Sequence, residues 1–318
     1  MPVPPSASPA APASSPHASS GPARSSGTLF ADGADRPLAL VIRTAGTNCD
    51  AEMCRAFELA GARVQLVHVD RLIADPARVD AFDLIGFPGG FSYGDDVASG
   101  RILAVKLRER LYPALRAAAQ RGCPMIGACN GFQVLVQVGL LPGPASSSAF
   151  SAHSSDPHWP ADRAPEQTVA LAHNSGGRFI DRWVKVRVNN ASPCIWTRGL
   201  AGAFAGPAES DIMQLPIAHG EGRFVTASDA VLDALRRGGQ IALTYAESVN
   251  GSQEDIAGIC DATGRIFGLM PHPERYLDWT LHPFWTRLDA KIRSGAAPTP
   301  GLMMFQNAVR AVASTPAR

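Results

Sequence analysis

The stretch PMIGACNGFQVLVQVGLL (124–141) places a cysteine between two glycines at a change of pattern. PMIGA (124–128) is a short apolar run typical of a buried strand, and GFQVLVQVGLL (131–141) predicts a helix. A nucleophile flanked by glycines between a strand and a helix is the nucleophile-elbow pattern, because only small neighbours permit so tight a turn. The positive end of the helix would stabilise a thiolate. This pattern predicts that Cys129 is an activated nucleophile; the alternative is a buried structural cysteine.

Upstream of this elbow, strand-like and helix-like runs alternate. A helix from Thr47 or Asn48, either of which could serve as its N-cap, is expected to run through Ala60 and end at Gly61. A second, longer helix covers 102–122 and is expected to restart near Pro113. Three apolar runs predict strands: LALVI (38–42), RVQLVHV (63–69) and FDLIGF (82–87). This alternation predicts an α/β fold with a doubly wound, mainly parallel sheet and flanking helices.

Two segments depart from the alternation. Residues 1–36 are dominated by Pro, Ala and Ser, which predicts a disordered tail without the features of a signal or transit peptide. Residues 143–168 have a similar bias, and we interpret them as a flexible surface insertion in a single domain over 37–318. After 169 the chain reads as short strands, with a hairpin loop at 261–264 and a closing helix near 302–312.

Charge and cysteine content exclude several classes of function. The net charge is +1 and the basic residues are scattered, which argues against a nucleic-acid or membrane-surface protein. No GxxxxGK[ST] loop is present, so no phosphate loop for a nucleotide is expected. The six cysteines form no CxxC pair, and we expect free thiols in a reducing cytoplasm.

A cysteine nucleophile needs a histidine base and a group that orients it. Two His-x-Glu pairs compete for this role, His219-Gly-Glu221 and His272-Pro-Glu274. Prolines stiffen the second pair and a strand-like run leads into it, so we favour His272 and Glu274. A metal site is a weaker alternative, since neither pair has an obvious third ligand, and we expect none.

A glycine-rich turn follows the third predicted strand at Pro88-Gly89-Gly90. Its backbone N–H groups, with that of Asn130, could bind the oxyanion of a tetrahedral intermediate. The next residues, Gly90-Phe-Ser-Tyr-Gly94, also match a serine elbow centred on Ser92. The residues after Ser92 are polar and do not begin an apolar helix, so a serine nucleophile is disfavoured.

Taken together, GACNGFQ and the downstream PHPE resemble the class I glutamine amidotransferases, which have a flavodoxin-like fold and a Cys–His–Glu triad. RTAGTNCDAE, FPGGFSYGDD, RFIDRWVKV, PIAHGEGRF and LMPHPER resemble one group among them, the glutaminase subunits of phosphoribosylformylglycinamidine synthase. The resemblance covers about 37–142 and 169–312. Phe132 departs from the pattern, since many relatives carry Cys there, and the tail and insertion lie outside it.

This resemblance implies a glutaminase that produces ammonia for purine synthesis. Cys129 would attack glutamine, His272 would transfer protons, Glu274 would orient His272, and Gln133 and His219 would line the glutamine pocket. Ammonia would pass to an ATP-dependent formylglycinamidine ribonucleotide synthetase, with a small bridging subunit; ATP and Mg²⁺ would belong to the synthetase and no cofactor to this chain. Three alternatives remain open: the glutaminase of another amidotransferase, a partner-independent cysteine hydrolase and a non-catalytic regulatory module.

Overall fold

The apolar run at 38–42 forms strand β1 (Leu38–Arg43), which lies inside the parallel half of a mixed sheet. The computed structural model describes residues 36–144, 159, 164–204, 212–295 and 297–314. Within them, nine strands form one sheet and β5 (Val169–Ala172) pairs with β8 (Arg223–Thr226) beside it. Across the large sheet the order is β2 (Arg63–His68), β1, β3 (Leu84–Phe87), β4 (Met125–Ala128), β11 (Ile266–Leu269), β10 (Ile256–Cys260), β9 (Ile241–Tyr245), β6 (Ile180–Val188) and β7 (Gln214–His219).

The sheet has a parallel and an antiparallel half. Strands β2, β1, β3, β4 and β11 pair in parallel, whereas β10, β9, β6 and β7 extend the sheet by antiparallel pairing. The predicted doubly wound, flavodoxin-like sheet is confirmed, and the predicted loop at 261–264 does join the antiparallel pair β10 and β11. Because β4 and β11 are parallel, the residues that follow them emerge at one edge of the sheet.

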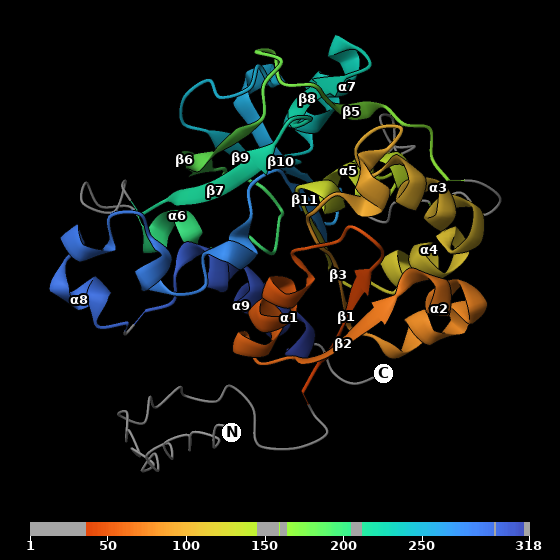
Figure 1. Cartoon of the computed structure of the whole chain (residues 1–318), viewed down its shortest axis with the longest axis horizontal. Helices are drawn as coiled ribbons and strands as arrows, with labels where there is room; N and C mark the ends of the chain where they lie inside the picture. The colour runs from red at the N-terminus through yellow and green to blue at the C-terminus, as the bar shows by residue number, and fades with distance from the viewer. Residues whose placement is uncertain (1–35, 145–158, 160–163, 205–211, 296, 315–318) are drawn as a thin grey trace, which may run out of the picture.

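Alternate residues of β1 enter two separate apolar cores. Leu40 and Ile42 pack with α3 (Arg101–Arg110), α4 (Tyr112–Gln120) and α5 (Asn130–Val138), whereas Ala39 and Val41 pack with α1 (Asp50–Leu59) and α9 (Pro300–Ala313). These two groups of helices lie on opposite sides of the sheet (Figure 1). The other helices of the described residues are α2 (Val69–Ala74), α6 (Leu200–Ala203), α7 (Asp229–Arg237) and α8 (Ala290–Arg293). Short 3-10 turns occur at η1 (Pro76–Ala81), η2 (Ser92–Asp95), η3 (Gln253–Asp255), η4 (Pro273–Arg275), η5 (Trp279–Leu281) and η6 (Trp285–Arg287).

Two helix boundaries test the sequence analysis. The long helix restarts as predicted, because Leu111 leaves helical geometry and Pro113 occupies the first turn of α4. The predicted N-cap of α1 was wrong: Cys49 holds that position and makes no side-chain cap. The Thr47 hydroxyl instead accepts a hydrogen bond from the Thr44 N–H at 3.2 Å.

Most of the tail and of the 143–168 insertion lies outside the described residues, so both interpretations stay predictions. Within the insertion, the side chain of Trp159 is 2% exposed and belongs to the core that contains α5. In the described part of the chain, no helix combines the length and apolar character that membrane crossing demands.

Candidate active site

Cys129 lies at the sharp turn between β4 and α5. Its φ is +51° and its ψ is −108°, a strained conformation for a side chain larger than hydrogen. A Cβ on Gly131 would stand 1.8 Å from the Phe87 carbonyl oxygen, and one on Gly127 would stand 2.6 Å from the Gly131 carbonyl. These close approaches explain the glycines on both sides of the cysteine. The nucleophile-elbow geometry is therefore present.

Backbone and sulfur of Cys129 each have a partner from the C-terminal half of the chain. The Cys129 N–H donates to the Leu269 carbonyl at 2.8 Å, which fixes the elbow to β11. Its sulfur lies 3.6 Å from the Ala218 carbonyl oxygen, at the end of β7. With an exposed fraction of 5%, Cys129 is nearly closed off from bulk water.

His272 and Glu274 form a direct pair at η4. The His272 Nδ1 lies 2.6 Å from the Glu274 Oε1, and both side chains are buried. Burial acts to lower the pKa of His272, but the charges of Glu274 and Cys129 outweigh it and raise that pKa well above its usual value. Because Nδ1 is occupied by Glu274, Nε2 is the nitrogen left for proton transfer; it is buried and has no hydrogen-bond partner among the described residues.

The glycine-rich turn after β3 packs against this pair. A Cβ on Gly89 would stand 2.6 Å from the Cε1 atom of His272 and 3.4 Å from the Ala128 carbonyl oxygen. Gly90 follows with a φ of +133° and forms an isolated bridge with Thr47. The structure therefore brings Gly89, Gly90, Cys129 and His272 together, as the sequence analysis expected.

His219 does not pair with Glu221, although the spacing resembles that of His272 and Glu274. The Asn174 side-chain N–H₂ donates to the carbonyls of Arg178 and His219, both at 2.9 Å. The Asn174 Oδ1 is thus the acceptor for the His219 Nδ1–H, at 3.1 Å, and for the Gly222 N–H, at 3.2 Å. Burial, with the nearby charge of His272, lowers the pKa of His219 to about 4, so this ring is neutral at physiological pH.

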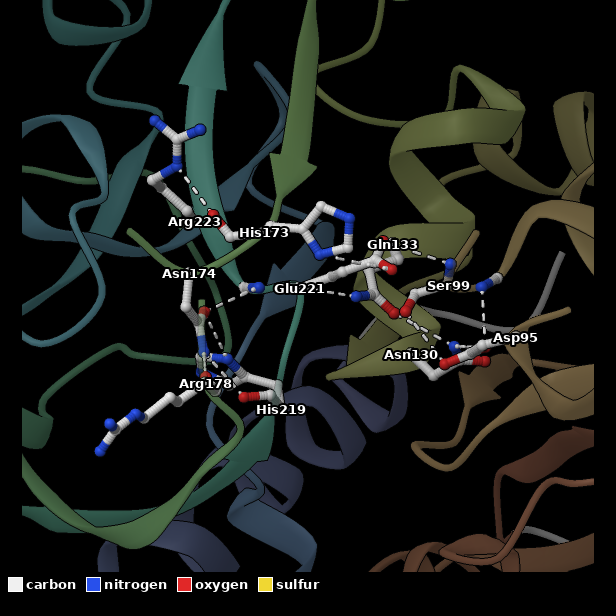
Figure 2. A network of polar contacts seen from close by, with 12 residues as sticks. Asp95, Ser99, Asn130, Gln133, His173, Asn174, Arg178, His219, Glu221 and Arg223 are labelled. Atoms are coloured by element: carbon white, nitrogen blue, oxygen red, sulfur yellow. Dashed lines mark hydrogen bonds and ion pairs between the residues drawn. The ribbon is translucent and has the colours of Figure 1, made fainter. Parts of the chain in front are cut away.

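Glu221 instead belongs to a polar network around the start of α5 (Figure 2). Its carboxylate accepts from the Ser99 N–H at 3.3 Å, and its backbone carbonyl accepts from the Gln133 side chain. The Asn130 side chain donates to Gln133 at 3.1 Å and to Asp95 at 3.0 Å. The side chains of Gln133 and Asn130 therefore hold together the loops around the elbow.

Ser92 lacks the geometry of a nucleophile elbow. It begins the 3-10 turn η2 and is not followed by an α-helix in the way that Cys129 is. Its N–H donates to the Asn130 Oδ1 at 3.3 Å, so its backbone supports the network around α5. The structure gives the serine alternative no support.

Three further residues of the site were missed by the sequence analysis. Cys49 lies with its sulfur 3.9 Å from the His272 Nδ1, and the Arg275 guanidinium donates to that sulfur at 3.1 Å. Asn174 fixes the ring of His219. Cys49 lies in RTAGTNCDAE and Arg275 in LMPHPER, two stretches that carry the family resemblance but do not predict that these residues contact His272 or each other. No sequence pattern pointed to Asn174. The three donor atoms of Cys49, His272 and Glu274 lie within 4.8 Å of one another, but the cationic Arg275 on the sulfur leads us to assign no metal there.

Comparison with known proteins agrees with this geometry. A family model described as a CobB/CobQ-like glutamine amidotransferase domain matches residues 36–312. The phosphoribosylformylglycinamidine synthase subunit PurQ of Dehalococcoides mccartyi is 38% identical over 278 residues, covering 85% of this chain and 96% of the relative. The chain belongs to the PurQ family of glutamine amidotransferases.

Other PurQ-family members support the assignment. The PurQ subunit of Methanococcus maripaludis is 38% identical over 253 residues, covering 76% of this chain and 83% of the relative. Among solved structures, a chain of PurLQS from Thermotoga maritima aligns with a TM-score of 0.57 and 32% identity, covering 87% of this chain and 99% of that one. The structural match extends over both halves of the sheet, so the PurQ-type fold includes the strands that supply Cys129 and His272.

Proposed function

We propose that this PurQ-family chain is the glutaminase subunit of a phosphoribosylformylglycinamidine synthase in purine biosynthesis. One observation carries the proposal: a strained cysteine elbow after β4 meets a buried His–Glu pair after β11 in a chain of that family. The three groups have the roles that amide hydrolysis through a thioester requires. They come from two parallel strands, so the fold fixes their relative positions.

In the first half-reaction, Cys129 acts as the nucleophile. Its sulfur, with its proton transferred to the Nε2 of His272, attacks the side-chain amide carbon of glutamine and forms a C–S bond. The tetrahedral intermediate collapses by breaking the C–N bond, and Nε2 returns the proton to the departing nitrogen, which leaves as ammonia. The product on the protein is a glutamyl thioester, and Glu274 keeps Nδ1 oriented throughout.

In the second half-reaction, water replaces ammonia. His272 removes a proton from the water as its oxygen attacks the thioester carbon, the C–S bond breaks, and glutamate leaves with the thiol restored. The raised pKa of His272 favours the charged ring that accompanies a Cys129 thiolate. We assign binding of the oxyanion of the tetrahedral intermediate to the backbone N–H groups of Gly89, Gly90 or Asn130, which belong to the same site.

Glutamine recognition is assigned to groups that surround the elbow. Gln133 and His219 are both buried, and the Nε2 of His219 has no hydrogen-bond partner in the described part of the chain. With Nδ1–H donated to Asn174, this Nε2 is an acceptor for a substrate N–H group. Gln133 would exchange its present partners for the substrate.

The ammonia requires an acceptor on another protein. We propose a PurL-type synthetase that uses ATP and Mg²⁺, together with a PurS-type bridging subunit, because the T. maritima structure that this chain resembles is a PurLQS assembly. The chain itself would carry no cofactor, and the complex would act in the cytoplasm.

The test compares wild-type protein, Cys129→Ala and Ser92→Ala, each with the cognate synthetase. We expect Cys129→Ala to abolish glutamate release and glutamine-dependent synthesis while ammonium chloride still supports synthesis by the complex. Ser92→Ala should keep most of its activity, because Ser92 lacks elbow geometry. Full glutamine use by Cys129→Ala would overturn the proposed nucleophile. Complete loss in a folded Ser92→Ala protein would revive the serine alternative.

A further inference from the structure

A second cysteine, Cys49, lies near the Nδ1 edge of the His272 ring, which is the edge that contacts Glu274. Cys49 is the N-cap of α1, and its sulfur is 3.9 Å from the His272 Nδ1, the nitrogen that faces Glu274 at 2.6 Å. The side chain of Cys49 is buried, with 1% of its surface exposed. The thiol therefore belongs to the immediate surroundings of the proposed base and cannot reach bulk solvent.

Besides His272, the sulfur of Cys49 contacts Arg275 and Asn48. The Arg275 guanidinium donates to it at 3.1 Å, and the Asn48 Oδ1 lies 4.0 Å from it. The Cys49 N–H donates to the Gly89 carbonyl at 3.2 Å, so the same residue ties α1 to the glycine-rich turn. Gly89 in turn lies against the Cε1 edge of His272, where a Cβ would be 2.6 Å from the ring. Cys49 thus connects two of the surfaces that enclose the imidazole.

We propose that Cys49 is a positioning residue for His272, whose sulfur confines the Nδ1 side of the ring together with Glu274 while its backbone holds Gly89 against Cε1. The inference rests on the proposed function, in which His272 exchanges protons with Cys129. A sulfur at this place fills the space into which the ring would otherwise turn, and such a turn would break the alignment with Glu274. Because small displacements of a proton-transfer group cost large factors in rate, the effect falls on kcat rather than on KM.

Cys49 also contributes to the electrostatics of the ring. The groups that face His272 are Glu274 from η4, Cys129 from the elbow, His219 from the end of β7 and Cys49 from the N-cap of α1. Hydrogen bonding to Cys49 is one of the smaller influences that raise the pKa of His272, after the charges of Glu274 and Cys129. Removal of the sulfur therefore lowers this pKa, and the alkaline limb of the kcat/KM profile moves to lower pH.

The experiment compares Cys49→Ala with Cys49→Ser, and uses Cys54→Ala as the matched control on the same helix. Cys54 is half-buried, and the groups that influence its pKa after burial are Asp50, Glu58 and Arg43 rather than site residues. With the full complex, we expect Cys49→Ala to lower kcat about 10- to 100-fold with KM for glutamine within about twofold. Cys49→Ser should recover most of the rate because a hydroxyl still accepts from Arg275, and Cys54→Ala should match wild type. Unchanged kcat and unchanged pH limbs in a folded Cys49→Ala protein would overturn the proposal.

A second measurement separates this inference from the proposed function and from misfolding. Titration of the His272 ring by NMR in the wild-type, Cys49→Ala and Cys49→Ser proteins needs no catalysis. A His272 pKa that is lowered in Cys49→Ala and closer to the wild-type value in Cys49→Ser supports the positioning role even if wild type were to release no glutamate. An unshifted His272 resonance and pKa in the folded Cys49→Ala protein would count against it, whatever the glutaminase assay shows.

Discussion

The chain contains two His-x-Glu pairs with the same spacing, and they have opposite chemistry. His272 and Glu274 contact each other directly at 2.6 Å, and the pKa of His272 is raised well above its usual value by Glu274 and Cys129, against the effect of burial. His219 contacts Asn174 instead, and burial lowers its pKa to about 4. Equal spacing therefore brings two side chains within reach, whereas the backbone and the third neighbour decide whether they make contact.

The backbone between the histidine and the glutamate differs between the two pairs, and the sequence partly predicts this difference. Pro273 lies between His272 and Glu274 and begins the 3-10 turn η4, which curls the carboxylate back to the ring. Gly220 lies between His219 and Glu221, after the last residue of β7, and there Glu221 turns away to the N–H of Ser99. The first pair therefore keeps a charged His272 ring beside Cys129. In the second pair, His219 contacts Asn174 and Glu221 contacts Ser99.

The largest effect should come from His272→Ala. Without the proton-transfer group, glutamine-dependent synthesis should fall by about 10³- to 10⁴-fold, while ammonia-dependent synthesis by the complex stays near wild type. Steady-state kinetics with each nitrogen source provides the measurement. If the variant retained more than a tenth of the glutamine-dependent rate, His272 would not be the base and the two pairs would not differ in function.

Glu274→Gln should reduce kcat on the order of 10²-fold. An amide keeps the shape but removes the charge that raises the pKa of His272, so the alkaline limb of kcat/KM should also move to lower pH. A pH–rate series on the complex measures both. A normal rate with an unshifted limb would show that the 2.6 Å contact does not influence catalysis.

The two histidines should have opposite effects on stability as the pH changes. The folded-state pKa of His219 lies below its unfolded value, so this residue's contribution is fully present above about pH 6.5 and is lost as the pH falls toward 4. The full loss is on the order of 3 kcal/mol. Urea unfolding at several pH values should show a shallower slope of the free energy of unfolding against pH between pH 4 and 6.5 for His219→Asn than for wild type.

For His272, with its raised pKa, the contribution to stability is present below about pH 6.5 and is lost as the pH rises through the folded-state pKa.

Identical slopes for the His219→Asn variant and wild type would mean that His219 titrates normally in the folded chain. That outcome would remove the electrostatic half of the comparison, while leaving the contact with Asn174 to be tested by its own substitution.

The smallest effect is expected for Glu221→Gln. The Gln133 side chain contacts the Glu221 backbone carbonyl, which the substitution keeps, and the carboxylate accepts from Ser99 without touching His219. We expect kcat to change less than about threefold. A loss comparable to that of Glu274→Gln would show that the two pairs are functionally alike despite their geometry.

The sequence predicted the parts of the site that depend on local pattern. The elbow at Cys129 followed from its glycines and from the apolar runs on either side, and the choice of His272 followed from its prolines. The contact between Cys49 and His272 could not be predicted, because it joins the start of α1 to a turn that follows β11 at the other end of the chain. The hydrogen bond between the side chains of Asn174 and His219 could not be predicted either, because NSGGR (174–178) indicates only a polar turn.

Likewise, the flavodoxin-like half of the sheet could be predicted because most of its strands are short apolar runs that alternate with helices. The order of the antiparallel strands, with β6 between β9 and β7, could not be predicted from the sequence. Pairing over such distances depends on which edges remain free when the chain folds, and no local signal encodes that choice.

The parallel pairing of β4 with β11 has a consequence for protein synthesis. The ribosome completes the elbow at Cys129 long before it reaches Ala218, Leu269 or His272, the groups that later contact or activate it. Until β11 enters the sheet beside β4, the nascent thiol has no base and no backbone anchor at Leu269. Premature termination products that lack the last strand would therefore not hydrolyse cellular glutamine, so the strand order itself delays reactivity until translation of the catalytic domain is almost finished.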